Sequence, residues 1–409
     1  MKHNWQLVFV VVIVFGMVLS GCGAQPAAAP APAPTVAPAP TEAPALTVAP
    51  APTEAPAPTE APAPTEAPAP TEAPAPTEAP APTEAPMAMT VPEGALVSVM
   101  TDAAPVLDGM GDDAAWAAAP ETVIPVSGGA NNGSTDIVLK SVHDGEMVYY
   151  LVTWEDPTES FIRAPWEKQA DGTWKTLKDP NDKGGDNNLY YEDKLAFIWD
   201  IGGSIKGFDT AGCMGLCHVG ENPDKKPFGN KCTPAAGQIG DIWHWKSVRN
   251  LNQIDDQYLD DTHYSADTPE AGRKSDAKES GGYVNNETKD KKLPAFMPPG
   301  GGSKDGGPGY ILDSEKVAFD DGLFKAGDQL PGIVKSALVG DRGDIAAGWQ
   351  WADGKWTLEF GRKLVTGSKT DVQFDKLDGV YPFGMATFDN AQVRHAFQAG
   401  TTPFVFRQP

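Results

Sequence analysis

Two cysteines and a histidine stand close together in the segment Gly212-Cys213-Met214-Gly215-Leu216-Cys217-His218. The whole chain has only 4 cysteines and 6 histidines, so a chance grouping of this kind is rare. Two thiols on one turn of backbone can add to the two vinyl groups of a haem, and the imidazole of the next residue then lies under the iron. The segment therefore predicts one haem c, bound covalently through Cys213 and Cys217, with His218 as the proximal iron ligand.

The spacing of this group is one residue longer than the common C-x-x-C-H pattern. In a helix the extra residue adds ~1.5 Å of rise, which the flanking glycines Gly212 and Gly215 can absorb. Two other interpretations stay open. One is a disulfide between Cys213 and Cys217, and the other is a closed zinc site with four ligands, Cys213, Cys217, His218 and Cys232.

The first 22 residues are typical of an export signal. Lys2 and His3 precede an apolar run from Leu7 to Leu19, which is too short to span a bilayer comfortably. The run ends at Leu19-Ser20-Gly21-Cys22, which resembles a bacterial lipobox. We therefore expect residues 1–22 to form a lipoprotein signal peptide, Cys22 to carry the lipid, and the mature protein to lie outside the cytoplasm, on the cell surface or the periplasmic face of a membrane.

Residues 23–89 consist almost wholly of Pro, Ala, Thr and Glu, and they repeat with a period of six between Thr35 and Pro86. Such a segment has nothing to bury and its prolines favour polyproline II, so it is expected to be a disordered spacer. At ~3.1 Å per residue its roughly 60 residues reach on the order of 200 Å when extended. The spacer can therefore hold a domain well clear of a membrane.

The globular domain is expected to span residues 90–409. Of the 55 acidic residues seven lie in the spacer, and of the 32 basic residues one, Lys2, lies in the signal, so the domain has a net charge of −17. This balance argues against nucleic acid and anionic membrane surfaces as partners. A basic redox protein would fit it.

Short strands with hairpin turns dominate the pattern of this domain. Residues 136–142 and 147–154 flank an Asp-Gly turn, and residues 345–352 and 355–360 flank another. Further strands are expected at residues 96–101, 194–201, 241–248 and 383–388. No stretch has a sustained helical period, so the fold is expected to be mainly β, a β-sandwich with long loop insertions. Residues 255–309 are polar and rich in Gly, Asp and Lys, and they predict a long excursion or lid, with room for a short helix.

The order of several loose motifs is similar to the haem-binding domain of the ethylbenzene dehydrogenase gamma subunit and its relatives in the dimethyl sulfide dehydrogenase group. The matching motifs are Leu107-Asp108-Gly109 with Ala115-Trp116, His143-Asp144-Gly145, Trp154-Glu155-Asp156, Glu192 to Phe197, Cys213 to His218, Asp241 to Lys246, Trp356 to Arg362 and Phe383 to Asn390. The resemblance implies an immunoglobulin-like β-sandwich that holds one haem and passes electrons. It also implies a non-enzymatic role, as an electron carrier or as an electron-transfer subunit beside a molybdenum oxidoreductase or another cytochrome.

The iron's second axial ligand stays open. In the gamma subunits a methionine and a lysine hold a haem b; here the segment Cys213 to His218 takes the methionine's place, as in the c-type branch of the family, and Lys246 matches the lysine. A neutral lysine requires a pKa lowered by about three units from ~10.4, which costs about 4 kcal/mol, whereas histidine needs no such change. His244 shares a strand face with Lys246. His244, Lys246 and Met297, in a proline-flanked loop, are therefore all candidates, and His143, His263 and His395 are taken as structural or surface histidines.

A second class of function also fits part of the sequence. Leu107-Asp108-Gly109 with Ala115-Trp116 resembles the start of family 9 carbohydrate-binding modules, and 11 tryptophans could serve as stacking platforms for sugars. A binding domain stabilised by zinc, without a redox role, is a further alternative. A carbohydrate-binding module has no use for Cys213, Cys217 and His218, so these residues discriminate it from the haem hypothesis.

Overall fold

The computed structural model describes residues 91–182, 187–216, 231–301 and 309–407, and the side chain of Met214 is not described. The predicted signal peptide and spacer, together with Cys22, Cys217 and His218, lie outside these residues. Within them the fold is mainly β, as the sequence predicted, and no helix is long and apolar enough to cross a membrane.

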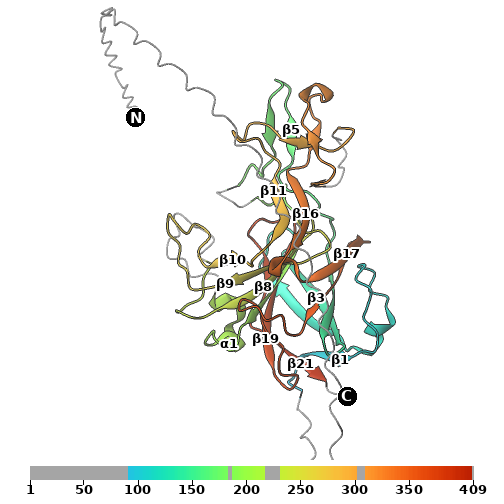
Figure 1. The fold of residues 1–409 in the computed structure, drawn as a ribbon, viewed down its shortest axis with the longest axis vertical. Coiled ribbons are helices and arrows are strands. Elements are labelled where there is room, and N and C mark those ends of the chain that lie inside the picture. Colours follow the sequence, from blue (N-terminus) through green and yellow to red (C-terminus); the bar gives the residue numbers. More distant parts are fainter. Residues whose placement is uncertain (1–90, 183–186, 217–230, 302–308, 408–409) are drawn as a thin grey trace, which may run out of the picture. The chain divides into compact units, whose positions relative to one another are not determined.

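One large sheet of 13 strands forms the body of the domain (Figure 1). Its strands run, in chain order, Leu96–Met100 (β1), Thr122–Ser127 (β2), Ser134–His143 (β3), Met147–Glu155 (β4), Lys194–Asp200 (β7), Gly240–Lys246 (β8), Asp255–Leu259 (β9), Arg273–Ser275 (β10), Ala346–Ala352 (β17), Lys355–Lys363 (β18), Tyr381–Phe388 (β19), Ala396–Gln398 (β20) and Thr402–Arg407 (β21).

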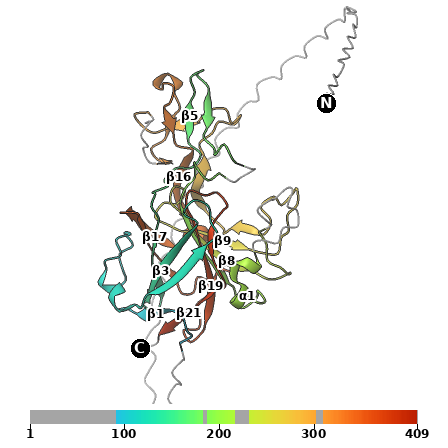
Figure 2. The same ribbon diagram turned by 180° about the vertical axis from the view of Figure 1, so that it is seen from behind.

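The order of strands along this sheet is β10-β9-β8-β7-β19-β20-β2-β3-β4-β18-β17. β19 and β3 are also connected through β21 and β1, because β21 pairs with β19 and β1 pairs in parallel with both β21 and β3. Figure 2 shows β1 and β21 at the same end of the sheet. The half with β3, β4 and β18 therefore faces the half with β7, β8 and β19, which gives the domain its sandwich character.

Three smaller sheets and a few short helical turns complete the domain. The smaller sheets contain Ser280–Asn285 (β11), Ile311–Leu312 (β13) and Ile333–Val339 (β16); Trp166–Lys168 (β5), Trp174–Thr176 (β6) and Gln329–Leu330 (β15); and Phe296–Met297 (β12) with Val317–Ala318 (β14). The helical turns are Phe208–Ala211 (α1), Ala114–Ala118 (η1), Gly212–Gly215 (η2), Asp321–Leu323 (η3) and Asp341–Gly343 (η4).

An aromatic core fills the space between the two halves of the sheet. Tyr150 of β4 stacks on Phe360 of β18 with ring centroids 4.9 Å apart, and it meets Trp243 of β8 at 5.6 Å. Trp154 of β4 likewise meets Trp245 of β8 at 5.6 Å. Aromatic side chains bury large apolar areas and prefer such offset or edge-to-face contacts. Because side chains alternate between the two faces of a strand, these rings all lie on the inner face of the sheet.

The two predicted hairpins are confirmed and their turns have a clear cause. In the first, the Asp144 carboxylate accepts hydrogen bonds from the backbone N–H groups of Glu146 and Met147, at 2.9 and 2.7 Å. In the second, Asp353 and Gly354 both have positive φ, 51° and 81°. Two successive residues of positive φ define the turn whose twist matches that of the flanking strands.

The polar stretch of residues 255–309 differs from the expectation of a lid with a short helix. Its described residues contain no helix; they contain the strands β9, β10, β11 and β12, of which β9 and β10 extend the main sheet beyond β8 (Figure 1). The reason is that β9 buries charged side chains. Asp255 and Asp256 are both fully buried, Asp255 in an ion pair with Lys246 and Asp256 within the electrostatic influence of Arg362, so a hydrophobic pattern cannot reveal this strand.

The motif around Leu107 to Trp116 has a structural role. The carboxylate of Glu359 on β18 accepts hydrogen bonds from the Gly109 N–H and from Trp116 Nε1, both at 2.8 Å. Gly109 has a φ of 83°, and a Cβ at this position would lie 2.3 Å from the backbone carbon of Trp349. Glycine is therefore required here, and the motif fastens the N-terminal loop to β18.

Candidate functional site

The strand β8 positions the two candidate iron ligands that the sequence placed on one face. Its whole length is buried, but its side chains alternate: Trp243 and Trp245 belong to the aromatic core, whereas Ile242 packs in a separate cluster on the outer face. His244 and Lys246 lie on the same outer face as Ile242, because side chains of a strand alternate with a period of two. The sequence prediction that His244 and Lys246 share a face is consistent with this register.

Cys213 lies over this outer face. It is 7% exposed and packs with Ile198 of β7, Ile242 of β8 and Phe208 of α1. A Cβ on Gly384 of β19 would lie 3.7 Å from the backbone nitrogen of Cys213, so the turn η2 rests directly on the sheet. Cys213 is not in a disulfide, and burial raises the pKa of its thiol.

The position of η2 depends on close backbone packing. Gly212 has a φ of 55°, and a Cβ there would lie 2.1 Å from the carbonyl oxygen of Gly400. Beside it the Thr401 hydroxyl donates a 2.6 Å hydrogen bond to the carbonyl of Asp209. The glycine that the sequence analysis treated as spacing flexibility therefore allows a tight contact between this turn and the loop before β21.

His244 is 6% exposed and lies opposite Ala196 of β7. Its ring stacks on Phe388 of β19, with centroids 5.7 Å apart and planes inclined by 28°. Phe388 is also contacted by His395, at 5.0 Å. No local signal in the sequence marks His395 as a neighbour of this site, because it is the loop between β19 and β20 that brings His395 to Phe388.

The imidazole of His244 has one satisfied nitrogen and one orphan. Nδ1 lies 3.2 Å from Nη2 of Arg273, and since arginine has only donors, Nδ1 accepts and the ring proton of the neutral form lies on Nε2. Nε2 is buried and has no hydrogen-bond partner. Leaving a buried polar atom unpaired costs about 1–3 kcal/mol, so this nitrogen marks a place where a ligand would be stabilising.

The charges around His244 are mostly positive, in a domain that is acidic as a whole. Burial lowers the pKa of His244 well below its usual value, and the cations Lys246, Arg273, Lys194 and Arg249 lower it further. The ring is therefore neutral near pH 7. A neutral imidazole is the form that binds metals.

Lys246 is engaged in a different way. Its side chain is fully buried and its ammonium forms an ion pair with the equally buried carboxylate of Asp255. Asp255 also accepts from the Arg342 guanidinium, at 2.6 Å to Nε and 3.0 Å to Nη2. Burial lowers the pKa of Lys246 and the charge of Asp255 opposes that shift. The lysine is thus one member of a buried charge network.

The remaining candidates lie elsewhere or outside the described residues. Met297 of β12 packs with Trp166, Trp174, Phe324 and Leu330, in a cluster distinct from that of Cys213. Cys232 is buried, and its sulfur lies 3.8 Å from Nδ1 of His263. Cys217 and His218 follow η2 directly in the chain but are outside the described residues, as is Cys22.

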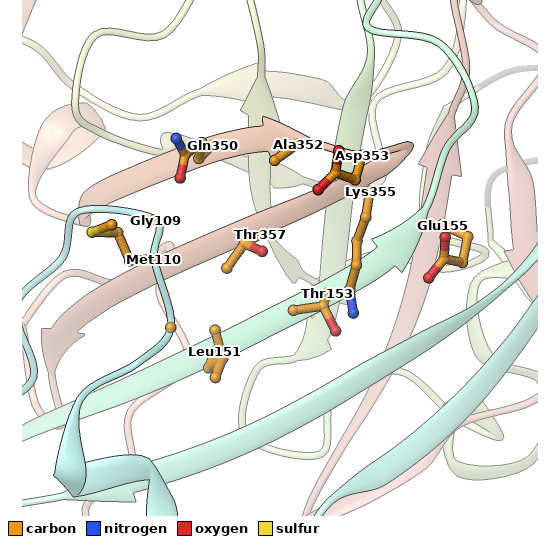
Figure 3. Close-up of a pocket in the computed structure, with 11 residues that line it drawn as sticks. Gly109, Met110, Leu151, Thr153, Glu155, Gln350, Ala352, Asp353, Lys355 and Thr357 are labelled. Atoms are coloured by element: carbon orange, nitrogen blue, oxygen red, sulfur yellow. The ribbon is translucent and has the colours of Figure 1, made fainter.

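A shallow pocket of about 450 Å³ lies on the outside of the other half of the sandwich. Figure 3 shows Thr153 and Glu155 of β4 beside Lys355 and Thr357 of β18, with Met110 at one end. None of the histidines or cysteines lines it. Of the 10 tryptophans within the described residues 8 are buried, and Trp349 and Trp351 pack against the core, so this pocket has no aromatic stacking platform.

Comparison with known families gives a decisive result. The profile of the family described as ethylbenzene dehydrogenase matches residues 113–400. The chain belongs to the ethylbenzene dehydrogenase family. The match includes β2 to β20, the turn with Cys213 and the strand with His244 and Lys246.

Other comparisons are weak. No curated protein matches the chain. A family 9 carbohydrate binding module from Caldicellulosiruptor kristjanssonii aligns in its glucose complex with 8% identity and a TM-score of 0.29, over 76% of this chain and 96% of its own. The cellotriose complex of such a module from Caldicellulosiruptor kristjanssonii aligns with 9% identity and a TM-score of 0.27, over 77% of this chain and 94% of its own. A putative carbohydrate-binding protein from Bacteroides uniformis aligns with 8% identity and a TM-score of 0.28, over 76% of this chain and 98% of its own. Alignments at this level of similarity do not indicate what this member of the ethylbenzene dehydrogenase family binds.

Proposed function

We propose that this member of the ethylbenzene dehydrogenase family is an extracytoplasmic, lipid-anchored haem protein that transfers electrons. One haem c would be attached through Cys213 and Cys217, with His218 below the iron and the lipid on Cys22. When bound, the haem would accept and release single electrons. The protein would act as a carrier or an electron-transfer subunit rather than as an enzyme, with a redox protein such as a molybdenum oxidoreductase or another cytochrome as its partner.

The observation that supports this proposal is that Cys213 and His244 both lie on the same outer face of the sheet. The turn with Cys213 rests on Gly384 and Ile198, and His244 follows on the adjacent strand with an unpartnered Nε2. The surface between them is built from small and apolar side chains, Ala196, Ile198, Ile242, Gly384 and Ala386, which suit a flat apolar ring.

The cations beside His244 support the same assignment. A haem carries two propionate carboxylates, and the guanidinium of Arg273 lies 3.2 Å from His244 Nδ1; Arg249, which also acts on His244, is already paired with Glu192. Carboxylates at this end of the face would find strong charge-assisted hydrogen bonds with arginine.

Among the candidates for the second axial ligand we favour His244. Its Nε2 is without a partner, although binding through that atom requires the ring proton to move to Nδ1 and Arg273 to release Nδ1. Lys246 would first have to leave Asp255 and lose its proton, and breaking a buried ion pair costs about 3–5 kcal/mol. Met297 lies in another cluster.

The test of the cofactor is direct. The full-length protein, exported from a host with haem-maturation machinery, should keep its haem through acid–organic extraction and give a c-type pyridine haemochrome. Cys213→Ala and Cys217→Ala should each leave a single thioether and shift the haemochrome band, whereas Cys232→Ala should not. A colourless protein that contains zinc would refute the proposal, and in that case the zinc alternative replaces it.

The test of the axial ligand compares two residues of one strand face. His244→Ala should open the iron to carbon monoxide and shift the Soret band, whereas Lys246→Leu should leave a low-spin haem that excludes carbon monoxide. The reverse result would make Lys246 the ligand. If both variants stay low-spin and closed, Met297→Leu becomes the decisive variant.

A further inference from the structure

A second group of chemically unusual side chains lies on the inner face of the sheet, away from Cys213. Asp241 of β8, Asp256 of β9 and Asp371 of the loop between β18 and β19 each bring one carboxylate oxygen within 4.8 Å of the others. Asp241 and Asp256 are fully buried and Asp371 is 1% exposed. Asp241 and Asp256 lie on the consecutive strands β8 and β9, whereas Asp371 comes from much later in the chain, and no sequence motif joins the three.

Each of these carboxylates has one satisfied oxygen and one orphan. Oδ2 of Asp241 accepts from Trp243 Nε1 and from the Val372 N–H, both at 2.9 Å, and from Arg362. Oδ2 of Asp371 accepts from Thr366 at 2.6 Å and from Arg362 at 3.2 Å. Oδ1 of Asp241, Oδ1 of Asp371 and Oδ2 of Asp256 are buried without any hydrogen-bond partner.

Arg362 does not complete the site. Its guanidinium is fully buried and contacts the Oδ2 atoms of Asp241 and Asp371, which leaves their Oδ1 atoms without a partner. One guanidinium against these three carboxylates leaves a net charge of −2 on the four side chains when all of them are ionised. Buried charges that lack partners are strongly destabilising, and they are found paired or bound to metals.

We propose that Asp241, Asp256 and Asp371 bind one calcium ion, which ties β8 and β9 to the loop between β18 and β19. A divalent cation brings the net charge of the group, including Arg362, to zero. The donors are all oxygens, which favours Ca²⁺ or Mg²⁺ over metals that prefer nitrogen and sulfur. Ca²⁺ accepts irregular arrangements of six to eight oxygens, whereas Mg²⁺ retains several waters, so a dry, carboxylate-rich interior favours Ca²⁺.

The alternative occupant of the site is a set of protons. Burial, together with the neighbouring carboxylates, raises the pKa of Asp241 to about 7, and it also raises the pKa of Asp256 well above its usual value. A protonated cluster and a calcium site therefore make opposite predictions for the removal of one carboxylate. The first predicts a neutral or stabilising effect, and the second predicts loss of metal-dependent stability.

The site is separate from the proposed haem face. Asp241 accepts from Trp243, whose ring belongs to the aromatic core, whereas His244 lies on the opposite side of β8. Arg362 lies over the same Trp243 ring, 5.0 Å from its centroid. A calcium ion here would close the end of the core, and it would be independent of whether the chain carries haem.

The experiment uses the full-length protein and measures metal content, melting and luminescence. Wild type purified with Ca²⁺ should contain one calcium per chain, and its melting midpoint should fall by about 5 °C in excess EGTA, the shift expected for a ligand at a hundredfold excess over Kd. Tb³⁺, which replaces Ca²⁺ in oxygen sites, should bind with luminescence excited through tryptophan, and Ca²⁺ should displace it.

Asp371→Asn should weaken calcium binding at least tenfold and remove the EGTA effect, whereas Asp375→Asn, an exposed aspartate of the same loop, should behave as wild type. If Asp371→Asn does not fold, Asp256→Asn and the metal content of the wild type carry the test. A wild type without calcium, whose midpoint is the same in Ca²⁺ and EGTA, would overturn the proposal. So would an Asp371→Asn protein more stable than wild type. Haem content should be the same in wild type and Asp375→Asn, with or without calcium.

Discussion

The ion pair between Lys246 and Asp255 makes the order of stability of two variants predictable. Asp255 is the hub of this network: it binds Lys246 and accepts two further hydrogen bonds from Arg342 and one of 2.9 Å from Gln257. In Lys246→Leu the carboxylate keeps Arg342, so the loss should be about 2 kcal/mol, below the usual 3–5 kcal/mol for a broken buried pair. In Asp255→Asn two cations lose their counter-charge together, and the loss should reach about 5 kcal/mol.

The assay is urea unfolding of the protein without haem, followed by tryptophan fluorescence. With an m-value of about 3 kcal/mol per M, the midpoints of the two variants should differ by about 1 M, with Asp255→Asn the lower. Asp313→Asn breaks the exposed pair with Lys316 and should cost less than about 1 kcal/mol. Equal midpoints for Lys246→Leu and Asp255→Asn, or the reverse order, would refute the assignment of Asp255 as the hub.

Four further expectations follow from other contacts. Burial and the nearby Asp389 raise the pKa of Asp156 to about 7, so its protonated form stabilises the fold below the unfolded pKa, and this stabilisation is lost as pH rises through 7. Asp156→Asn should therefore flatten the fall of unfolding free energy between pH 4 and 7 by up to about 1.4 kcal/mol per pH unit. Parallel curves of unfolding free energy against pH for wild type and Asp156→Asn would contradict this. Gly109→Ala should lower the free energy of unfolding by about 1–3 kcal/mol, because the new Cβ meets the Trp349 backbone at a positive φ, whereas Gly145→Ala meets no neighbour and should cost less. Arg273→Gln should alter the haem spectrum or its retention, while Arg407→Gln, at the exposed end of β21, should not. Cys22→Ser should appear in the soluble fraction with its haem, and deletion of the spacer should leave the spectrum unchanged; a membrane-bound Cys22→Ser protein would remove the lipid anchor from the proposal.

The sequence predicts the fold best where a strand follows a period of two or a turn contains Asp-Gly. The hairpins at Gly145 and Gly354 and the alternation of β8 are examples, because each depends on a few adjacent residues. It fails at β9, where Asp255, Asp256 and Gln257 are all buried. In the sequence, a strand with buried acidic side chains has the same polar pattern as a solvated loop. Only the structure shows that Lys246 pairs with Asp255 and that Arg362 lies near Asp256.

The candidate site likewise has one part that a local sequence pattern predicts and another part that depends on contacts between distant elements. Covalent haem attachment requires only a local pattern, so the prediction of Cys213, Cys217 and His218 depends on their spacing alone. The surroundings of His244 are not local: Arg273 comes from β10, Phe388 from β19 and His395 from the loop beyond it. The pairing of Lys246 with Asp255 also depends on two neighbouring strands, so this argument for His244 over Lys246 cannot be made from the sequence.

The position of β1 has a mechanical consequence for a tethered protein. β1 is the first strand after the spacer, and it lies between β21 and β3, parallel to both. A pull on the chain before Leu96 acts along the strand, at right angles to the hydrogen bonds that hold it on both sides. All of these bonds are then loaded together in shear, whereas an edge hairpin would open one bond at a time. If the chain is anchored through Cys22 as we propose, a force on the anchor would therefore reach the domain at a strand suited to resist it.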